Sequence, residues 1–451
     1  MPPNIVWLTI DALRYDYTSM SGERDLTPNI DAIADQSSGQ TFSRCFSHGI
    51  GTRTSSSSIL TGTYPSTHKV YGNTGAIPDE LETVPELFSR NGYRTVGISP
   101  NVHFSNATNL DRGFDEFHLL TEAKSILSST RIGDIAKFLS GIRKYSAGLD
   151  LEKTNHSLSY LTNCIAKRSL SSESQPVFAY IHYLDPHSPY RPPAKVFNQI
   201  CEDVGCTPEK ARSVLRDRHE NGLQWTNNYN KSDVDLIEAL YSAEIRFIDK
   251  MVGELIDTLE DDTIVIVTAD HGELFGEDNV FGHRLSVHPK LTNVPLVTRG
   301  IDILDQATTT PVQHTDVVRT ILEDSLGTRG DVQGVDLRTE IPNRAIVERG
   351  PLNFDSIPLD TDLLRKEFFS EHLYGVAAAN KYGVFEDGEA VEWFDLDAGE
   401  YCNISADHRS QLTSAFKRWQ TDVEQFQFNP NHAEMDERSK ERLRELGYLI
   451  D

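Results

Sequence analysis

Residues 4–16, NIVWLTIDALRYD, indicate the fold of this chain. The mostly apolar run from Asn4 to Ile10 has the length of one strand, and it ends at Asp11. A strand that is apolar on both faces is typical of a parallel sheet buried beneath helices. Because ligands of such sheets bind beyond the carboxyl ends of the strands, we expect Asp11 to lie at the functional edge.

The alternation of strand and helix continues along the chain. A helix is expected to begin at Thr27 and Pro28, which are typical of an N-cap and a first helical residue. Further strands and helices are expected within 83–99, 176–185, 232–261, 263–270, 294–300 and 315–325. This alternation predicts an α/β fold in which helices cover both faces of the sheet.

The character of the sequence changes near residue 340. Residues 1–340 carry the alternation and are expected to form the catalytic domain, with polar, helical or irregular insertions at about 121–172 and 197–231. Residues 341–451 contain short strand patterns separated by turns, such as KYGVFEDGEAVEWFDLD at 381–397, and then a charged helix. We expect them to form a smaller C-terminal α+β subdomain.

Charge and composition limit the possible partners. The 451 residues include 68 acidic and 43 basic side chains, and the net charge of −25 argues against nucleic acid or an anionic membrane face. No apolar run is long enough to cross a bilayer, and the start lacks the basic region of a signal peptide, so a cytoplasmic enzyme is expected. The five scattered cysteines predict neither a disulfide framework nor a zinc finger. The oligomeric state is left open.

Acidic and imidazole side chains stand at the ends of three expected strands. Asp11 ends the first, Asp270 and His271 follow TIVIVTA, and HYLDPH at 182–187 ends the third. A sheet that gathers such groups at one edge can build a metal site from distant segments. One divalent ion is therefore expected, although each acid taken alone would be a common helix cap or turn former.

Several motifs together resemble the sulfatase family of the alkaline phosphatase superfamily. They follow the family order over essentially the whole chain, and the most specific are ILTGTYPSTH at 59–68 and TADHGELFGE at 268–277. The resemblance implies an alkaline-phosphatase-like mixed sheet flanked by helices. It also implies a hydrolase whose substrate is a small anionic ester.

The resemblance places the nucleophile at Thr52. In sulfatases the nucleophile lies nine residues before the Thr of the LTG segment, within Cys-x-Pro-x-Arg, and counting back from Thr61 reaches Thr52 in TRTSS. Formylglycine is not expected from this stretch, and Thr52 is instead similar to the threonine nucleophile of phosphodiesterase-like members. The serines at 55–58 are expected to bond the backbone of their own helix. Thr54 or Ser55 would be the attacking group if the register slipped.

The resemblance also assigns metal ligands. Asp11, Asp270 and His271 match them, and Thr52 is expected as a further ligand. DALR at 11–14 is similar to the Asp-x-x-Arg start of phosphonate monoester hydrolases. His271 stands where many calcium-dependent sulfatases have Asn. An imidazole ligand favours Mn or Zn over Ca or Mg, although the carboxylates would tolerate either group.

Other site residues follow from the same motifs. His187 in DPHSPY and His283 in GHRLSV stand where the family has the groups that protonate the leaving oxygen, and an imidazole can donate a proton near neutral pH. His182, His288 and His314 have no such motif support. The candidates for gripping the substrate anion are Arg14, Arg53, Asn101 and His103.

The resulting prediction is a metal-dependent hydrolase that cleaves phosphate or phosphonate esters through a covalent Thr52 intermediate. Formylglycine sheds sulfate by hemiacetal collapse, and because threonine cannot follow this route, phosphorus substrates are favoured. The GKWHLG segment that holds sulfate in sulfatases is absent, and GISPNVHFSN at 97–106 stands in its place. A sulfuric ester hydrolase without formylglycine and an inactive sulfatase-like binding protein are the alternatives.

Overall fold

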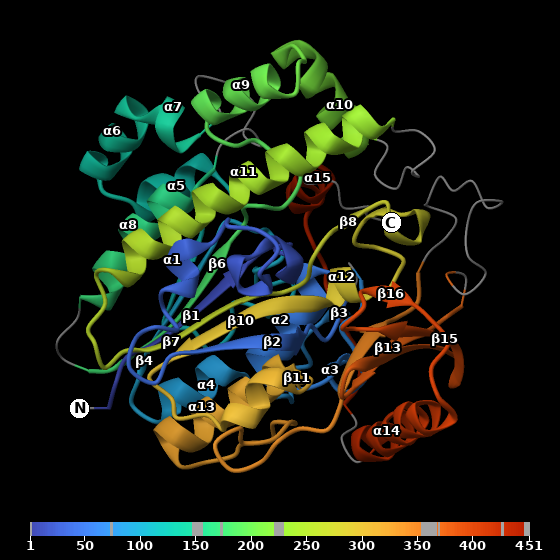
Figure 1. The fold of residues 1–451 in the computed structure, drawn as a ribbon. Coiled ribbons are helices and arrows are strands. Elements are labelled where there is room, and N and C mark those ends of the chain that lie inside the picture. The colour runs from blue at the N-terminus through green and yellow to red at the C-terminus, as the bar shows by residue number, and fades with distance from the viewer. Residues whose placement is uncertain are drawn as a thin grey trace.

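The computed structural model describes residues 2–72, 75–146, 157–171, 175–220, 230–352, 368, 370–424 and 428–445. Its centre is a mixed eight-stranded sheet with the order β11-β2-β10-β7-β1-β6-β4-β5 (Figure 1). The strands are β1 (Ile5–Ile10), β2 (Gln40–Phe46), β4 (Arg94–Ser99), β5 (Glu116–Leu119), β6 (Val177–Tyr183), β7 (Ile264–Ala269), β10 (Asn293–Arg299) and β11 (Val312–Gln313).

The register of the central strands brings their ends together. β1 pairs in parallel with β7 and β6, and β4 pairs in parallel with β6. Ile10 is level with Ala269 on one side and Tyr183 on the other, so the residues that follow these strands emerge next to one another. β10 runs antiparallel to β7 and β2, which confirms the expected mixed sheet.

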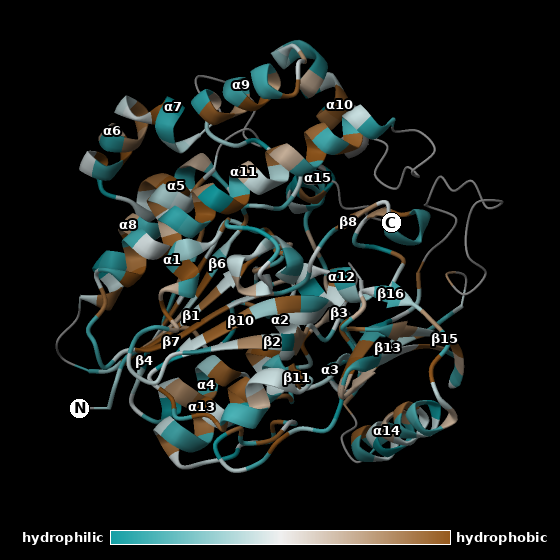
Figure 2. Cartoon of the chain, viewed as in Figure 1, coloured by the Kyte–Doolittle hydropathy of each residue, from teal (hydrophilic) through white to brown (hydrophobic). Residues whose placement is uncertain are grey.

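Helices cover both faces of this sheet, as the alternation predicted (Figure 1). One face carries α1 (Pro28–Asp31), α8 (Ser159–Leu170) and α11 (Lys231–Ile256), and the other carries α2 (Thr52–Thr61), α4 (Val84–Arg90) and α13 (His314–Leu326). Every residue of β1, β6 and β7 is buried between them, and the strands form the apolar centre of the fold (Figure 2). This burial explains why these strands read as continuous apolar runs.

The helix expected after Thr27 is shorter than its pattern suggests. α1 has only four residues, because Ala34, Gln36 and Gly39 then form turns that bond the carbonyl three residues earlier. In contrast, α4 begins where expected, and a capping box between Thr83 and Glu86 satisfies its first amides.

The segments expected to be insertions, about 121–172 and 197–231, contain several helices in their described parts. α5 (Ala123–Ser129), α6 (Ile132–Ser140) and α7 (Ile142–Tyr145) follow β5, while α9 (Ala194–Asp203) and α10 (Pro208–Glu220) follow β6. Among the helices in the described ranges, none combines the length and the apolar character that a bilayer crossing requires.

A separate antiparallel sheet forms the smaller domain, in the order β12-β13-β14-β15-β16. Its strands are β12 (Ala345–Arg349), β13 (Leu373–Ala378), β14 (Lys381–Glu386), β15 (Glu389–Asp395) and β16 (Glu400–Tyr401). α14 (Ala406–Glu424) buries Phe416 and Trp419 on one face of this sheet, and Tyr382 on the other face stacks on Phe46 of the large domain.

The end of the chain returns to the large domain. We call residues 428–445 the C-terminal strap; it contains β17 (Asn431–His432), which pairs with β3 (Gly75–Ala76), and α15 (Glu437–Glu445). The remaining short elements are α3 (Pro65–His68), β8 (Leu274–Phe275), β9 (Phe281–Gly282), α12 (Pro289–Thr292) and 3₁₀ turns at 15–17, 19–21, 277–279 and 305–309.

Candidate active site

Four neighbouring strands deliver polar side chains to one edge of the large sheet. β7 leads to Asp270 and His271, β1 leads to Asp11, β6 carries His182 next to its end, and the turn after β4 carries Asn101. All five side chains are fully buried. The arrangement follows from the parallel register, because the carboxyl ends of these strands meet at the same edge.

Asp11, Asp270 and His271 form a group that could hold a cation. Their ligand atoms all lie within 4.8 Å of one another. Oδ1 of Asp270 accepts hydrogen bonds from the backbone amides of Ala12 and His271, at 3.2 and 3.0 Å. Oδ2 of Asp270 is buried and has no hydrogen-bond partner among the described residues. A divalent ion would supply the partner that this buried carboxylate oxygen lacks.

The tautomer of His271 fits the same role. Its Nδ1 lies 2.7 Å from the carbonyl oxygen of Gly272, so Nδ1–H donates there and Nε2 keeps its lone pair. Nε2 faces Asp11 Oδ1 at 3.4 Å and Thr52 Oγ1 at 3.3 Å. The three residues therefore fit a divalent ion in both geometry and donor type.

The two carboxylates have opposite pKa shifts. Burial alone would raise the pKa of Asp11, but the imidazoles of His187, His182 and His271 bring it well below its usual range. Burial, followed by the negative charge of Asp11, raises the pKa of Asp270. The site therefore holds one firmly ionised carboxylate and a second one that a nearby cation would help to ionise.

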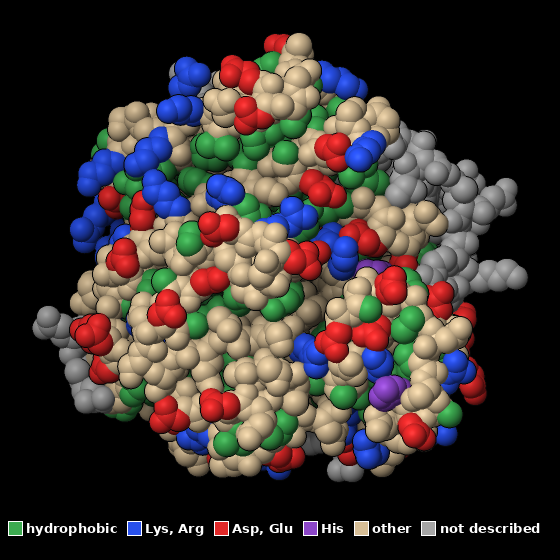
Figure 3. Space-filling view, in the orientation of Figure 1, with side chains coloured by type: hydrophobic (Ala, Val, Ile, Leu, Met, Phe, Trp, Pro, Cys, Tyr) green, Lys and Arg blue, Asp and Glu red, His purple; other side chains and the backbone are tan. Residues whose placement is uncertain are grey.

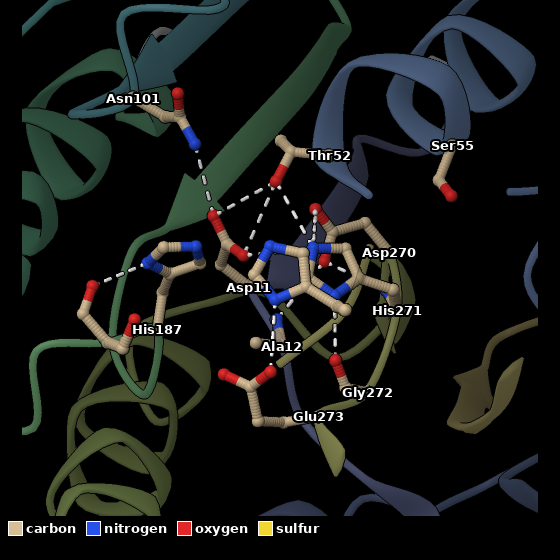
Figure 4. Close-up of polar contacts among 12 residues, drawn as sticks. Asp11, Ala12, Thr52, Ser55, Asn101, His187, Asp270, His271, Gly272 and Glu273 are labelled. Atoms are coloured by element: carbon tan, nitrogen blue, oxygen red, sulfur yellow. Dashed lines mark hydrogen bonds and ion pairs between the residues drawn. The ribbon is translucent and has the colours of Figure 1, made fainter. Parts of the chain in front are cut away.

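Thr52 is the first residue of α2, after Gly51, and its side chain is fully buried. Its Oγ1 lies 3.4 Å from each carboxylate oxygen of Asp11, at the end of a helix whose free amides favour negative charge. In Figure 4 the Thr52 hydroxyl and the Asn101 amide converge on Asp11, whereas the Ser55 hydroxyl points away. Ser55 donates instead to the carbonyl of Gly49.

Arg53 supplies a buried positive charge next to Thr52. Its Nε donates to Nδ1 of His103 at 3.2 Å, and its Nη2 lies 3.1 Å from the sulfur of Met435 in the C-terminal strap. Asn101 donates from Nδ2 to Asp11 at 3.1 Å and accepts from the backbone amide of His103 at 3.0 Å. Burial and the charge of Arg53 lower the pKa of His103 well below its usual value, so this imidazole is a neutral acceptor.

His187 and His283 lie next to the metal-ligand group. Their ring centroids are 5.1 Å apart, and the His283 ring is 4.3 Å from that of His271. His187 bonds through Nδ1 to the carbonyl of Ser188, and His283 bonds through Nδ1 to Oε1 of Glu273 at 3.0 Å. Burial, mainly, lowers the pKa of His283 to about 4.

Arg14 is engaged elsewhere. Its guanidinium pairs with Asp16 at 2.7 Å and with Glu277 at 3.0 Å, and it also donates to the carbonyl of Glu273. Because two carboxylates already neutralise the charge of this guanidinium, Arg14 is not among the proposed contacts of the substrate anion. Asp185 is not part of the metal-ligand group, and its carboxylate accepts hydrogen bonds from Ser157 and Ser159.

One residue of this site, Glu273, was not singled out from the sequence, and another, His182, was considered at a strand end but given no role. His182 lies 3.1 Å from Asp11 Oδ2, and its place at the end of a strand beside β1 was the available signal. Glu273 is fully buried and joins His283 to the hydroxyl of Tyr190. Its only signal was its position two residues after His271. His288 caps α12, and His314 bonds Thr268, so neither belongs to the site.

Comparisons with known proteins identify the family of this chain. A profile of the sulfatase family matches residues 3–324. The chain is 24% identical over 450 residues to a choline-sulfatase of Rhizobium meliloti, covering 92% of this chain and 84% of that protein.

Among solved structures, the phosphonate monoester hydrolase of Agrobacterium radiobacter aligns with a TM-score of 0.67 and 18% identity, over 94% of this chain and 95% of that one. BT4656 in complex with its substrate D-glucosamine-2-N,6-O-disulfate aligns with a TM-score of 0.70 and 17% identity, over 94% and 99% of the two chains. At these identities the structural matches establish the fold. The family profile spans most of the chain, and this protein therefore belongs to the sulfatase family of ester hydrolases.

Proposed function

We propose that this protein hydrolyses phosphate or phosphonate esters with Thr52 as the nucleophile and one divalent ion as cofactor. The observation that carries the proposal is the position of Thr52 Oγ1, at the head of α2 and between Asp11 and His271. The solved phosphonate monoester hydrolase with the same fold supports a phosphorus substrate.

Asp11, Asp270 and His271 would hold the ion, and the imidazole favours Mn or Zn. When bound, the ion would lower the pKa of the Thr52 hydroxyl and balance the charge of the ester oxygens. The amides at the start of α2 and the guanidinium of Arg53 add to this anion-binding potential. Asn101 holds Asp11 in place through its amide.

The reaction has two displacement steps. Thr52 gives its hydroxyl proton to solvent water as Oγ forms a bond to phosphorus and the bond between phosphorus and the leaving oxygen breaks, and His187 or His283 gives a proton to that oxygen. Water then attacks the phosphorus of the Thr52 ester, and the bond to Oγ breaks to restore the hydroxyl. Threonine has no second hydroxyl on its carbon, so attack by water at phosphorus is the route by which the ester is released.

A sulfuric ester is the second candidate, because the choline-sulfatase and other curated relatives are named for sulfate esters. The metal-loaded enzyme should be tested on matched aryl sulfate, phosphate monoester, phosphate diester and phosphonate monoester substrates. We expect turnover of a phosphorus ester. Higher turnover of the aryl sulfate would favour the second candidate.

The nucleophile is tested with Thr52→Ala and the matched variant Thr54→Ala. We expect at least about a thousandfold loss of kcat/KM for the first and a change of only a few-fold for the second. Peptide mass mapping of protein that is denatured during turnover should place the phosphoryl group on the peptide that contains Thr52. Loss of activity in Thr54→Ala with retention in Thr52→Ala would overturn the assignment, and a chain that neither binds metal nor turns over any ester would favour a binding role.

A further inference from the structure

The segment from α5 to α7 has a charge opposite to that of the protein. Residues 123–145, AKSILSSTRIGDIAKFLSGIRKY, contain five basic side chains and one acidic side chain, Asp134, in a chain whose net charge is −25. The basic side chains are Lys124, Arg131, Lys137, Arg143 and Lys144, and all five are exposed. Figure 3 shows basic side chains gathered at the upper left of the molecule, where Figure 1 places α6 and α7.

The same segment exposes large apolar side chains. Leu127, Ile132 and Leu139 have exposed fractions of 62%, 87% and 56%, which are the three highest among the large hydrophobic residues of the described chain. In α6, Ile132, Ala136 and Leu139 follow the spacing of one helix face, and all three are exposed. An apolar stripe of this kind on a surface helix indicates contact with another apolar phase.

The inner face of the segment is already packed. Phe138 is buried and stacks on Tyr160 of α8, at a centroid distance of 6.3 Å, and Tyr145 stacks on the same ring at 4.2 Å. Arg168 of α8 donates to the carbonyl of Ser129 at the end of α5. The outward stripe is therefore a second apolar face, which no packing contact among the described residues uses.

The basic side chains are also available to a partner. Within the described residues, no ion pair joins any of the five to a carboxylate. Three aliphatic side chains that protrude from short helices, with basic side chains around them, fit the interfacial region of a bilayer with an anionic surface. The concentration of five basic side chains in one segment of a chain with a net charge of −25 is complementary to an anionic surface, and this charge pattern favours a bilayer as the occupant.

We propose that residues 123–145 are a peripheral docking surface for an anionic lipid bilayer. Ile132, Leu139 and Leu127 enter the headgroup region, and the five basic side chains contact the lipid phosphates. The acidic remainder of the surface is repelled by the same membrane, so the protein docks in a single orientation. This inference goes beyond the proposed ester hydrolysis and does not depend on it.

The test is sedimentation of the full-length, metal-loaded protein with vesicles of phosphatidylcholine alone or mixed with phosphatidylglycerol. We expect binding only to the mixed vesicles, and weaker binding as salt increases. Each basic side chain near an anionic surface changes the partition coefficient by about fivefold, so Arg143→Gln with Lys144→Gln should lower it by about 30-fold. Ile132→Ser with Leu139→Ser should lower it by about tenfold or more, including at high salt.

The matched control is Lys417→Gln with Arg418→Gln, two adjacent exposed basic side chains on α14. It should change the partition coefficient by less than about twofold. Equal losses in the control and the Arg143/Lys144 variant, or no binding of the wild type to mixed vesicles, would overturn the proposal. So would a dimer, seen by sedimentation velocity without lipid, that the Ile132/Leu139 variant dissociates, because the face would then belong to a second copy. Turnover of dissolved esters should be unchanged in every variant.

Discussion

Replacing Asp270 with Asn should change thermal stability in opposite directions with and without metal. Asn keeps an oxygen that can accept from the amides of Ala12 and His271, but it removes the negative charge that Asp11 repels. Without a cation this repulsion opposes folding, and with a cation the lost carboxylate is a lost ligand. The crossing of signs distinguishes a metal site from an ordinary pair of buried acids.

The size of each effect follows from the structure. The ligand oxygens lie within 4.8 Å, and at an effective dielectric constant of about 20 such a like-charge pair costs about 3.5 kcal/mol. Attraction to His271 offsets part of this cost, so we expect Asp270→Asn to raise the free energy of unfolding by about 1–2 kcal/mol in EDTA. A divalent ion present at about 100 times its Kd should stabilise the wild type by about 2.7 kcal/mol.

These free energies convert into shifts of Tm. Unfolding 451 residues at about 2.1 cal/mol/K per residue gives an entropy near 0.95 kcal/mol/K, so 1 kcal/mol shifts Tm by about 1 °C. Calorimetry should show a gain of about 3 °C when Mn²⁺ or Zn²⁺ is added to the wild type. The Tm of Asp270→Asn should be about 1–2 °C above that of the wild type in EDTA, and it should rise much less when the ion is added. An equal metal response in the two proteins would refute the assignment of Asp270.

Three further predictions use other contacts. Glu273→Ala should lower kcat about 10- to 100-fold through loss of the hydrogen bond to His283, and a double-mutant cycle with His283→Ala should show non-additive losses. Burial raises the pKa of Glu348 from 4.5 to about 7, so between these pH values the folded state holds a proton that the unfolded state has lost. Chemical denaturation should therefore show that the free energy of unfolding falls from about pH 4.5 to 7, and that it falls less steeply in Glu348→Gln. Gly375→Ala would place a Cβ 1.6 Å from the Tyr382 hydroxyl oxygen and should lower unfolding free energy by about 1–3 kcal/mol.

The residues at strand ends were accessible from the sequence. Asp11 and Asp270 each follow a run that is apolar on both faces, and parallel pairing with equal register brings such ends together even though the two residues are far apart in the chain. The central sheet and its two helical layers were also predicted correctly, because the alternation of apolar strand patterns and amphipathic helix patterns indicates this fold. The spacing from Thr61 placed Thr52 at the start of its helix, where α2 begins.

Residues whose roles depend on pairing between segments could not be found in this way. Arg14 was a candidate for the substrate anion, but its partner Glu277 lies on the turn between β8 and β9, and no local pattern links the two. The same hairpin brings Glu273 opposite His283, ten residues later. α1 was overestimated because its apolar spacing continues into turns, and periodicity alone does not separate a helix from a series of turns.

The end of the chain is also part of the candidate site. The C-terminal strap reaches Arg53 through Met435, pairs with the strand whose Gly75 carbonyl accepts from the same guanidinium, and buries Leu443 against Val102, between Asn101 and His103. Arg438 of the strap also pairs with Glu122, which caps α5 in the first insertion. The setting of Arg53 is therefore complete only when residues near both ends of the chain have met.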